Sequence, residues 1–382
     1  MRIAQVAPLY ESVPPLYYGG TERIVSYLTE ELIHQGHDLT LFASGDSITN
    51  ALLLAPCPRS LRLDPNCIDP LTYNFLLLEH VFQHADLFDI IHFHIDYLHF
   101  PFSRRNPTAH VTTLHGRLDI PDLVPLYREF KDMPVVSISA PQRIPLPWIN
   151  WQATVHHGVP LSLYDLNRSE GQYLAFLGRI SPEKRVDRAI EIAKLFGMKL
   201  KIAAKVDRVD SQYMETVIKP LLDDPLVEFV GEIGEKEKGE FLGNAYALLF
   251  PIDWCEPFGL VMIESMACGT PVIAYRNGSV PELVEDSVTG FVVSSIEESV
   301  RALEKVPRFD RARCRQVFEK RFSATRMAND YVKIYETLQH NKRGRRTKNL
   351  NQEVIKAPAA TPDLMDCPKT VAATRVGVRV RP

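Results

Sequence analysis

The stretch that decides the fold runs from Pro251 to Gly290 and reads PIDWCEPFGLVMIESMACGTPVIAYRNGSVPELVEDSVTG. It predicts a strand end, a turn through Glu256 and Gly259, a short helix with Glu264, a break at Gly269 and a second strand. Gly259 lets the backbone approach a ligand closely, and the helix after it directs free N–H groups at the turn, which favours an anion. Glu264 lies about 7 Å along the helix axis at ~1.5 Å per residue. That offset suits a nucleotide with its phosphate at the helix N-terminus and its sugar diol further along.

The residues around this helix form a longer pattern. Glu256 and Glu264 flank the segment EPFGL, and CGTPV, GSVPELV and TGFVV follow. Taken alone, two such carboxylates also fit a solvated helix face. The whole segment resembles the sugar-donor site of retaining glycosyltransferases of family 4, also called group 1 glycosyltransferases. The resemblance covers roughly residues 1–340 and implies the α/β GT-B fold, with two facing Rossmann-like doubly wound domains and a C-terminal helix that crosses back to the first domain.

The apolar segments predict one architecture twice along the chain. A strand, a long loop, an amphipathic helix and a second strand open the sequence, as in a parallel doubly wound sheet. The pattern restarts with an apolar strand over 173–177. The expected organisation is an N-terminal Rossmann-like acceptor domain at 1–159 with a returning helix at 324–340, a C-terminal nucleotide-sugar donor domain at 160–323, and a disordered basic tail at 341–382.

Length and charge narrow the class of protein. A chain of 382 residues is long enough for two domains. The net charge of −3 conceals an asymmetry, because residues 341–382 carry ten Lys and Arg against three acidic residues, which leaves −10 on the rest of the chain. A body this acidic argues against a nucleic-acid-binding protein.

The cysteines and the apolar runs of the sequence indicate the cellular compartment of the protein. The six cysteines are scattered without finger or redox spacing, which is typical of reduced thiols in a cytosolic protein. The N-terminal apolar run is too short for a signal peptide, and no window reaches the roughly 20 apolar residues that span a membrane. We expect a cytoplasmic protein, with peripheral contact between its basic tail and the inner face of the membrane left open.

Two further motifs concern the sugar donor. Gly19 and Gly20 precede the first helix, and Arg179 and Lys184 form the motif G-R-x-x-x-x-K after a strand. Alone, these motifs also fit a plain turn and a solvated loop. The resemblance implies that the glycines lie beside the donor diphosphate and that the two cations hold it. An Arg fork and a Lys point charge suit a leaving pyrophosphate.

The resemblance also assigns roles to other residues. His115 would orient the transferred sugar, Glu256 would accept one of its hydroxyls, and Glu264 would take the ribose hydroxyls. The candidate catalytic residues are therefore His115, Glu256, Arg179 and Lys184, and the candidate donor-binding residues are Gly19, Gly20, Arg179, Lys184, Phe258, Gly259, Leu260 and Glu264.

The acceptor side is less defined. Asp96 and Tyr97 fall just past the C-terminal end of the strand DIIHFH, where ligands of open α/β sheets gather. His92 and His94 share one face of that strand, but without a third ligand at a suitable spacing we interpret them as packed histidines rather than a metal site. The acceptor could be a small molecule, a lipid-linked sugar or a glycan.

The resemblance implies a retaining, metal-independent hexosyltransferase that uses a nucleotide sugar, with UDP-glucose as first candidate and GDP-mannose as second by their frequency in the family. The chain has no Asp-x-Asp pair to hold a divalent ion, so no cofactor is expected. A GT-B sugar-nucleotide epimerase and a non-catalytic GT-B binding or regulatory protein remain as alternatives. Trp254, Cys255 and Asn277 depart from the family pattern near the sugar pocket and leave the sugar open.

Overall fold

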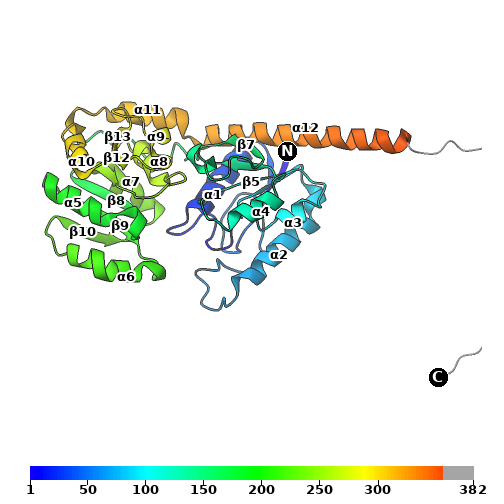
Figure 1. The fold of residues 1–382 in the computed structure, drawn as a ribbon, viewed down its shortest axis with the longest axis horizontal. Helices are drawn as coiled ribbons and strands as arrows, with labels where there is room; N and C mark the ends of the chain where they lie inside the picture. Colours follow the sequence, from blue (N-terminus) through cyan, green and yellow to red (C-terminus); the bar gives the residue numbers. More distant parts are fainter. Residues whose placement is uncertain (356–382) are drawn as a thin grey trace, which may run out of the picture. The chain divides into compact units, whose positions relative to one another are not determined.

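The computed structural model describes the backbone of residues 1–355 and the side chains of residues 1–341. Residues Met1–His340 form one compact unit that contains two sheets, and a second unit begins at Asn341. The expected disorder of residues 356–382 lies outside the described residues. Figure 1 shows the two sheets with helices on their faces.

The first sheet has seven parallel strands in the order β3-β2-β1-β4-β5-β6-β7. Its strands are β1 (Arg2–Val6), β2 (Asp38–Phe42), β3 (Leu52–Leu54), β4 (Ile90–Phe93), β5 (His110–Thr113), β6 (Val135–Ser137) and β7 (Trp151–Thr154), and its helices are α1 (Gly20–His34), α2 (Pro70–Gln83), α3 (Phe100–Ser103) and α4 (Leu123–Glu129). The apolar central strands are buried on both faces, as in parallel sheets covered by helices. Strand order reverses between β1 and β4, and such a switch point opens a crevice at the carboxyl ends of the strands.

The second sheet repeats this design with six parallel strands in the order β10-β9-β8-β11-β12-β13. Its strands are β8 (Tyr173–Arg179), β9 (Leu200–Lys205), β10 (Val227–Gly231), β11 (Ala245–Phe250), β12 (Val272–Tyr275) and β13 (Gly290–Val293), and its helices are α5 (Val186–Phe196), α6 (Ser211–Tyr213), α7 (Glu235–Gly243), α8 (Leu260–Ala267), α9 (Val280–Leu283), α10 (Ile296–Leu303) and α11 (Arg311–Arg321). Its switch point lies between β8 and β11, so the carboxyl end of β8 also faces a crevice. Short 3₁₀ or π turns are η1 (Ala85–Leu87), η2 (Pro141–Arg143), η3 (Pro182–Lys184), η4 (Arg208–Asp210), η5 (Met214–Ile218), η6 (Lys219–Leu221) and η7 (Val306–Arg308).

The chain crosses between the two sheets twice, and the crossings touch. The N–H of Val159 donates to the Phe322 carbonyl at 2.8 Å, and the N–H of Ala324 donates to the Val159 carbonyl at 3.0 Å. Gly158 is required here, because a Cβ at this position would lie 2.3 Å from the Ser323 carbonyl oxygen. The expected domain boundary at 159/160 falls at this crossing and stays a prediction.

The second crossing leads into α12 (Ala324–Ile355), the expected returning helix. Its buried residues Met327, Tyr331 and Tyr335 pack with Ile3 of β1 and Val111 of β5 in the core of the first domain. The helix is longer than predicted, because residues 341–355 are helical where the sequence suggests disorder. Lys, Arg, Gln and Glu favour helix, and the next proline comes only at position 358.

Two other segments form structure that their sequence alone does not indicate. The segment 234–239 reads GEKEKG, a charge pattern typical of an exposed stretch, but it begins α7. The segment 139–142 reads SAPQ, which resembles the capping box that opens a helix, but it forms only η2, since Pro145 and Pro147 follow closely and cannot donate to a continuing helix. Within the described residues, no helix combines the length and apolar character that crossing a membrane requires.

Candidate active site

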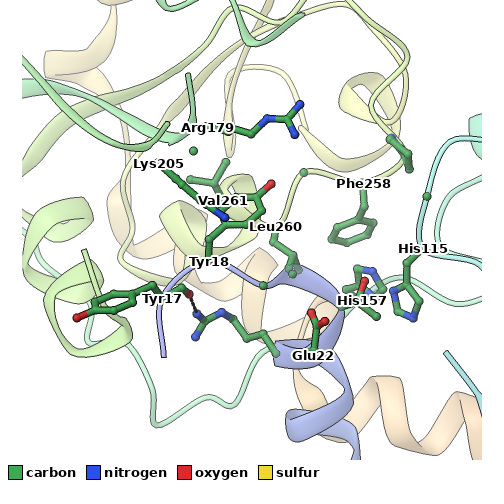
Figure 2. A pocket seen from close by; sticks show the side chains of 18 of the residues that line it. Tyr17, Tyr18, Glu22, His115, His157, Arg179, Lys205, Phe258, Leu260 and Val261 are labelled. Atoms are coloured by element: carbon green, nitrogen blue, oxygen red, sulfur yellow. Dashed lines mark hydrogen bonds between the residues drawn. The ribbon is translucent and has the colours of Figure 1, made fainter. Parts of the chain in front are cut away.

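One cavity of about 570 Å³ lies between the two domains, at the carboxyl ends of their central strands. Figure 2 shows His115 and His157 beside each other, with Arg179 on a separate segment of the lining. The predicted site residues that line it are Gly19, Gly20, Asp96, His115, Arg179, Lys184, Glu256, Phe258, Gly259, Leu260 and Glu264. Tyr97 does not line it; this side chain is 36% exposed and packs its ring edge against Tyr127.

The turn before α8 forms part of the second-domain wall. Gly259 has φ +80 and caps α8, in a conformation that other residues rarely adopt. A Cβ there would also lie 2.9 Å from the Met262 side chain and 3.0 Å from the Phe250 ring. The buried Phe258 is fixed by its carbonyl, which accepts a 2.7 Å hydrogen bond from Ser279. The rigid turn therefore presents the N-terminus of α8 to the cavity, as the sequence predicts.

Arg179, the last residue of β8, lies among three carboxylates. Its guanidinium donates to Glu183 at 2.5 Å and lies 3.4 Å from Asp210 and 3.6 Å from Asp207. Burial by itself lowers the pKa of Arg179, but Glu183 and Asp210 hold this pKa above its ordinary value. Arg179 therefore stays positively charged, and an anionic substrate could replace the carboxylates that lie beside it.

Lys184 belongs to the same turn, at the end of η3. Its ammonium forms an ion pair with Glu256 and lies 5.1 Å from the Trp254 ring centre, within cation–π range. Trp254, which departs from the family pattern, thus helps to hold the lysine. The structure brings two predicted site residues, Lys184 and Glu256, into direct contact.

Glu264 lies on α8 and has a partner that the sequence did not suggest. Its Oε1 accepts a 2.9 Å hydrogen bond from Lys238 of α7 and lies 3.4 Å from the Tyr164 hydroxyl. Burial lowers the pKa of Lys238, and the Glu264 carboxylate opposes that shift. A run of charges such as EKEKGE is typical of a solvated face, so only packing between α7 and α8 could identify Lys238.

The glycine loop forms the first-domain side of the entrance. A Cβ on Gly19 would lie 2.8 Å from Pro15, and a Cβ on Gly20 would lie 3.5 Å from the Leu260 side chain on the opposite domain. The N–H of Tyr18 donates to Glu232 at 3.0 Å, which also joins the loop to the second domain. The absence of side chains at Gly19 and Gly20 therefore keeps the loop close to the start of α8.

Three histidines, two of them buried and His115 half-buried, follow the strands of the first sheet. Nε2 of His115 lies 2.9 Å from Nδ1 of His94, and the His115 ring stacks on His157 at 5.3 Å. Burial lowers the pKa of His115 to about 3 and the pKa values of His94 and His157 well below the ordinary range. The rings are therefore neutral at physiological pH. His92 and His94 are packed, hydrogen-bonded histidines, in agreement with our interpretation of the sequence.

Two carboxyl groups lie on the same wall. Burial raises the pKa of Asp96 to about 6 and that of Glu22, which is 6% exposed, to about 7. Sequence reasoning missed Glu22, although it stands two residues after Gly20 in the first turn of α1. Proximity to the glycine motif was the signal that could have identified it.

A cavity between two Rossmann-like domains, with cations and a helix N-terminus on one wall and histidines on the other, defines the GT-B class of glycosyltransferases. The chain belongs to the group 1 glycosyltransferases. Residues 165–315 match the family described as Glycosyl transferases group 1, and residues 18–174 match Glycosyltransferase Family 4.

Curated relatives match only part of the chain. A D-inositol 3-phosphate glycosyltransferase of Mycobacterium marinum is 33% identical over 139 residues, which are 33% of this chain and 28% of that protein. An uncharacterized 41.2 kDa protein in the cps region of Klebsiella pneumoniae is 26% identical over 171 residues, which are 43% of this chain and 46% of that protein. The chain thus spans less than half the length of these relatives.

Solved structures share the fold over most of the chain. AviGT4, a glycosyltransferase involved in avilamycin A biosynthesis, superposes with a TM-score of 0.70 at 23% identity, over 89% of this chain and 98% of that chain. HepE of Anabaena, solved with UDP and glucose, gives 0.69 at 17% identity, over 88% and 100%. Sucrose-phosphate synthase of Thermosynechococcus elongatus gives 0.71 at 18% identity, over 88% and 99%. These likenesses show the two-domain GT-B fold.

Proposed function

We propose that this protein is a metal-independent, retaining glycosyltransferase that moves a hexose from a nucleotide sugar to a hydroxyl of an acceptor. One observation carries the proposal: a single cavity holds Arg179, Lys184 and the α8 N-terminus on one wall and neutral His115 on the other. The first wall suits a diphosphate, and the second suits an uncharged sugar.

The donor diphosphate would take the place of protein carboxylates. Arg179 and Lys184 are held by Glu183 and Glu256, so their positive charges are oriented before substrate arrives. When the sugar departs, negative charge grows on the leaving phosphate, and oriented cations stabilise that charge without reorganisation. Displaced from Lys184, Glu256 could accept a hydroxyl of the transferred sugar.

The ribose of the nucleotide would bind at Glu264. This carboxylate lies one and a half turns into α8, and only its Oε1 is bonded to Lys238 and Tyr164. Oε2 is left to accept the ribose hydroxyls, because no described residue contacts it through a hydrogen bond. Lys238 would then hold the Glu264 carboxylate in place and would not contact the reacting atoms.

The choice of donor rests on a neighbour. HepE was solved with UDP-glucose, with UDP and glucose, and with UDP. We therefore take UDP-glucose as the first candidate donor and GDP-mannose as the second. The acceptor, a small molecule, a lipid-linked sugar or a glycan, is left to experiment, as is contact with a membrane.

Retention follows from which base is available. With the leaving phosphate as the group that takes the acceptor proton, attack and departure occur on the same face of the sugar. An α-linked nucleotide sugar would then give an α-linked product. Glu22 and Asp96 are the carboxyl groups that could instead serve as a base from the first-domain side, and attack assisted by such a base from the far face of the sugar would give the opposite anomer.

The experiment is incubation with a panel of nucleotide sugars and acceptors, scored by released nucleotide and by NMR of the anomeric proton in fresh product, with and without EDTA. We expect an α-linked product and an unchanged rate with EDTA. A β-linked product contradicts retention. A rate abolished by EDTA and restored by Mg²⁺ contradicts metal independence. Isomerised donor without acceptor identifies an epimerase, and no turnover with any pair identifies a binding protein.

A further inference from the structure

A chain of hydrogen bonds begins at His115 and leads away from the cavity. Nε2 of His115 lies 2.9 Å from Nδ1 of His94, and Nε2 of His94 lies 2.8 Å from Oε1 of Gln5. The Gln5 amide nitrogen donates at 3.3 Å to the hydroxyl of Tyr335 on α12. The candidate catalytic histidine is thus connected to the returning helix through His94, which also lines the cavity, and through Gln5 behind it.

The chain continues beyond Tyr335. The Tyr335 hydroxyl lies 2.7 Å from Nδ1 of His92, whose Nε2 lies 2.7 Å from the Thr113 hydroxyl, and that hydroxyl lies 2.8 Å from the hydroxyl of Tyr331. Gln5, His92, His94, Thr113, Tyr331 and Tyr335 are all buried. Bulk solvent therefore does not reach these side chains, and each group hydrogen-bonds to its neighbours in the chain.

The amide of Gln5 gives this chain a direction. Its oxygen can only accept, so Nε2 of His94 must donate to it. Because burial keeps His94 neutral by lowering its pKa, Nδ1 of His94 carries no proton and must accept from Nε2 of His115. Beyond Gln5, the amide nitrogen donates to a lone pair of the Tyr335 hydroxyl, and this hydroxyl donates its own proton to Nδ1 of His92. The donor and acceptor roles along the chain are therefore mutually consistent.

We propose that His94 is a positioning residue that holds neutral His115 as the Nε2–H tautomer, so that the substrate meets an unprotonated Nδ1, a hydrogen-bond acceptor. Nε2 is the ring nitrogen of His115 for which the described residues provide a hydrogen bond. Nδ1 is thereby left for a ligand in the cavity.

This assignment defines a substrate class, which rests on the proposed function. The group that meets Nδ1 must itself donate a hydrogen bond, as a sugar hydroxyl does. We place the C6 group of the hexose at Nδ1, where a uronic-acid carboxylate would bring lone pairs against a lone pair and would lose its hydration without gaining a partner. The site therefore favours neutral hexoses and rejects their uronic acids.

The direct test is ¹⁵N NMR of the full-length protein labelled at histidine, with the His115 signals assigned by comparison with His115→Gln. Two-bond couplings distinguish a protonated Nε2 from a protonated Nδ1. We expect pure Nε2–H at neutral pH in the wild-type protein. An Nδ1–H tautomer, a charged imidazolium or an averaged spectrum overturns the proposal. This measurement needs no turnover.

Variants separate positioning from stability. In His94→Leu the His115 tautomers should average. In His94→Asn the amide oxygen lies near the position of the His94 Nδ1 and can still accept from Nε2 of His115, so this variant should retain the Nε2–H tautomer. The matched control is His99→Leu, which removes a buried histidine bonded to Ser103 and Thr112 but not lining the cavity. It should leave the His115 signals unchanged. Pure Nε2–H in His94→Leu would overturn the role of His94, and the wild-type spectrum decides the tautomer if that variant does not fold.

Kinetics give a second readout with UDP-glucose and UDP-glucuronic acid, scored by released UDP. We expect turnover of UDP-glucose alone, a kcat about ten- to a hundredfold lower in His94→Leu, and partial recovery in His94→Asn. Equal wild-type turnover of both donors overturns the proposal. Turnover of neither, together with an Nε2–H tautomer, contradicts UDP-glucose as the donor in the proposed function and leaves the role of His94 supported.

Discussion

The two walls of the cavity control charge in opposite ways. On the second domain, carboxylates lie beside the cations of Arg179 and Lys184 and form ion pairs with them. On the first domain, His115 and Glu22 face burial without an ion-pair partner among the described residues, and burial favours their neutral forms. One wall is therefore built to hold an ionic group and the other to hold an uncharged one.

This difference has a physical origin in the two strand ends. In the turn after β8, Arg179 pairs locally with Glu183, and Lys184 pairs with Glu256 from the turn before α8. Strands β4 and β5 are followed by histidines whose partners are other neutral side chains of the buried chain to Tyr335. The free-energy cost of removing charged groups from water is thus offset by ion pairs on the second domain and avoided by loss of charge on the first domain.

The largest effect that tests this comparison is expected on the charged wall. Arg179→Ala and Lys184→Ala should each lower kcat about 10²- to 10³-fold, or about 2.7–4 kcal/mol, because each removes a cation directed at developing charge. Steady-state kinetics with UDP-glucose measures this. Arg185→Ala is the matched control, since Arg185 is on the same turn but pairs with Asp187 and Asp253 and does not line the cavity. If both active-site variants have the wild-type rate, the diphosphate does not bind at Arg179 and Lys184.

The neutral wall predicts an effect on stability. Glu22 titrates near its usual 4.5 in the unfolded chain and near 7 when folded, so the folded state loses stability as pH rises from about 4.5 to about 7. Glu22→Gln stays neutral and should be more stable than wild type by up to about 3 kcal/mol at pH 8, with little difference at pH 4. Urea unfolding at both pH values tests this. If Glu22→Gln is less stable than the wild-type protein at pH 8, Glu22 is not a buried, unpaired carboxyl group.

Glu264→Gln should affect binding more than chemistry. A charge-assisted hydrogen bond contributes about 1.5–3 kcal/mol, and ribose does not change during transfer, so KM for the donor should rise about ten- to a hundredfold with kcat nearly constant. Glu240→Gln, an exposed change on α7, serves as control. An unchanged KM with a collapsed kcat would place Glu264 at the reacting centre instead.

The smallest effect concerns two neighbours in the sequence. Tyr97→Phe should leave kinetics and stability within about 0.5 kcal/mol of wild type, because its ring packs outside the cavity. Asp96→Asn changes a buried group of the cavity wall and should alter acceptor KM. If Tyr97→Phe raises acceptor KM severalfold while Asp96→Asn does not, the acceptor lies on the other side of this strand end.

Sequence patterns predicted the parts of the site that are local. The Gly259 turn, the α8 helix with Glu264, and the Arg179 to Lys184 turn each depend on residues close together in the chain, and the structure has them where expected. The short edge strand β3 was not predicted, since three leucines are too few to distinguish a strand from a loop.

What the sequence could not predict depends on long-range packing. Lys238 lies in a charged run, and its role depends on the position of α7 beside α8. The histidine network needs Gln5 and Tyr335, which are 330 positions apart. Tyr97 lies outside the cavity, whereas Ile95, Asp96 and Leu98 line it, and the positive φ of 50 at Asp96 is a local backbone conformation that the sequence pattern does not predict.

The paired crossings at Val159 and Ser323 have a consequence for the order of folding during synthesis. The ribosome makes the first sheet first, but Met327, Tyr331 and Tyr335, which complete the core of that sheet, are translated more than 160 residues after β7 ends at Thr154. The second sheet, by contrast, has all its strands by Val293. The domain that emerges first is therefore finished last, and until then it exposes the apolar surface that α12 will cover, which is when a nascent chain most needs a chaperone.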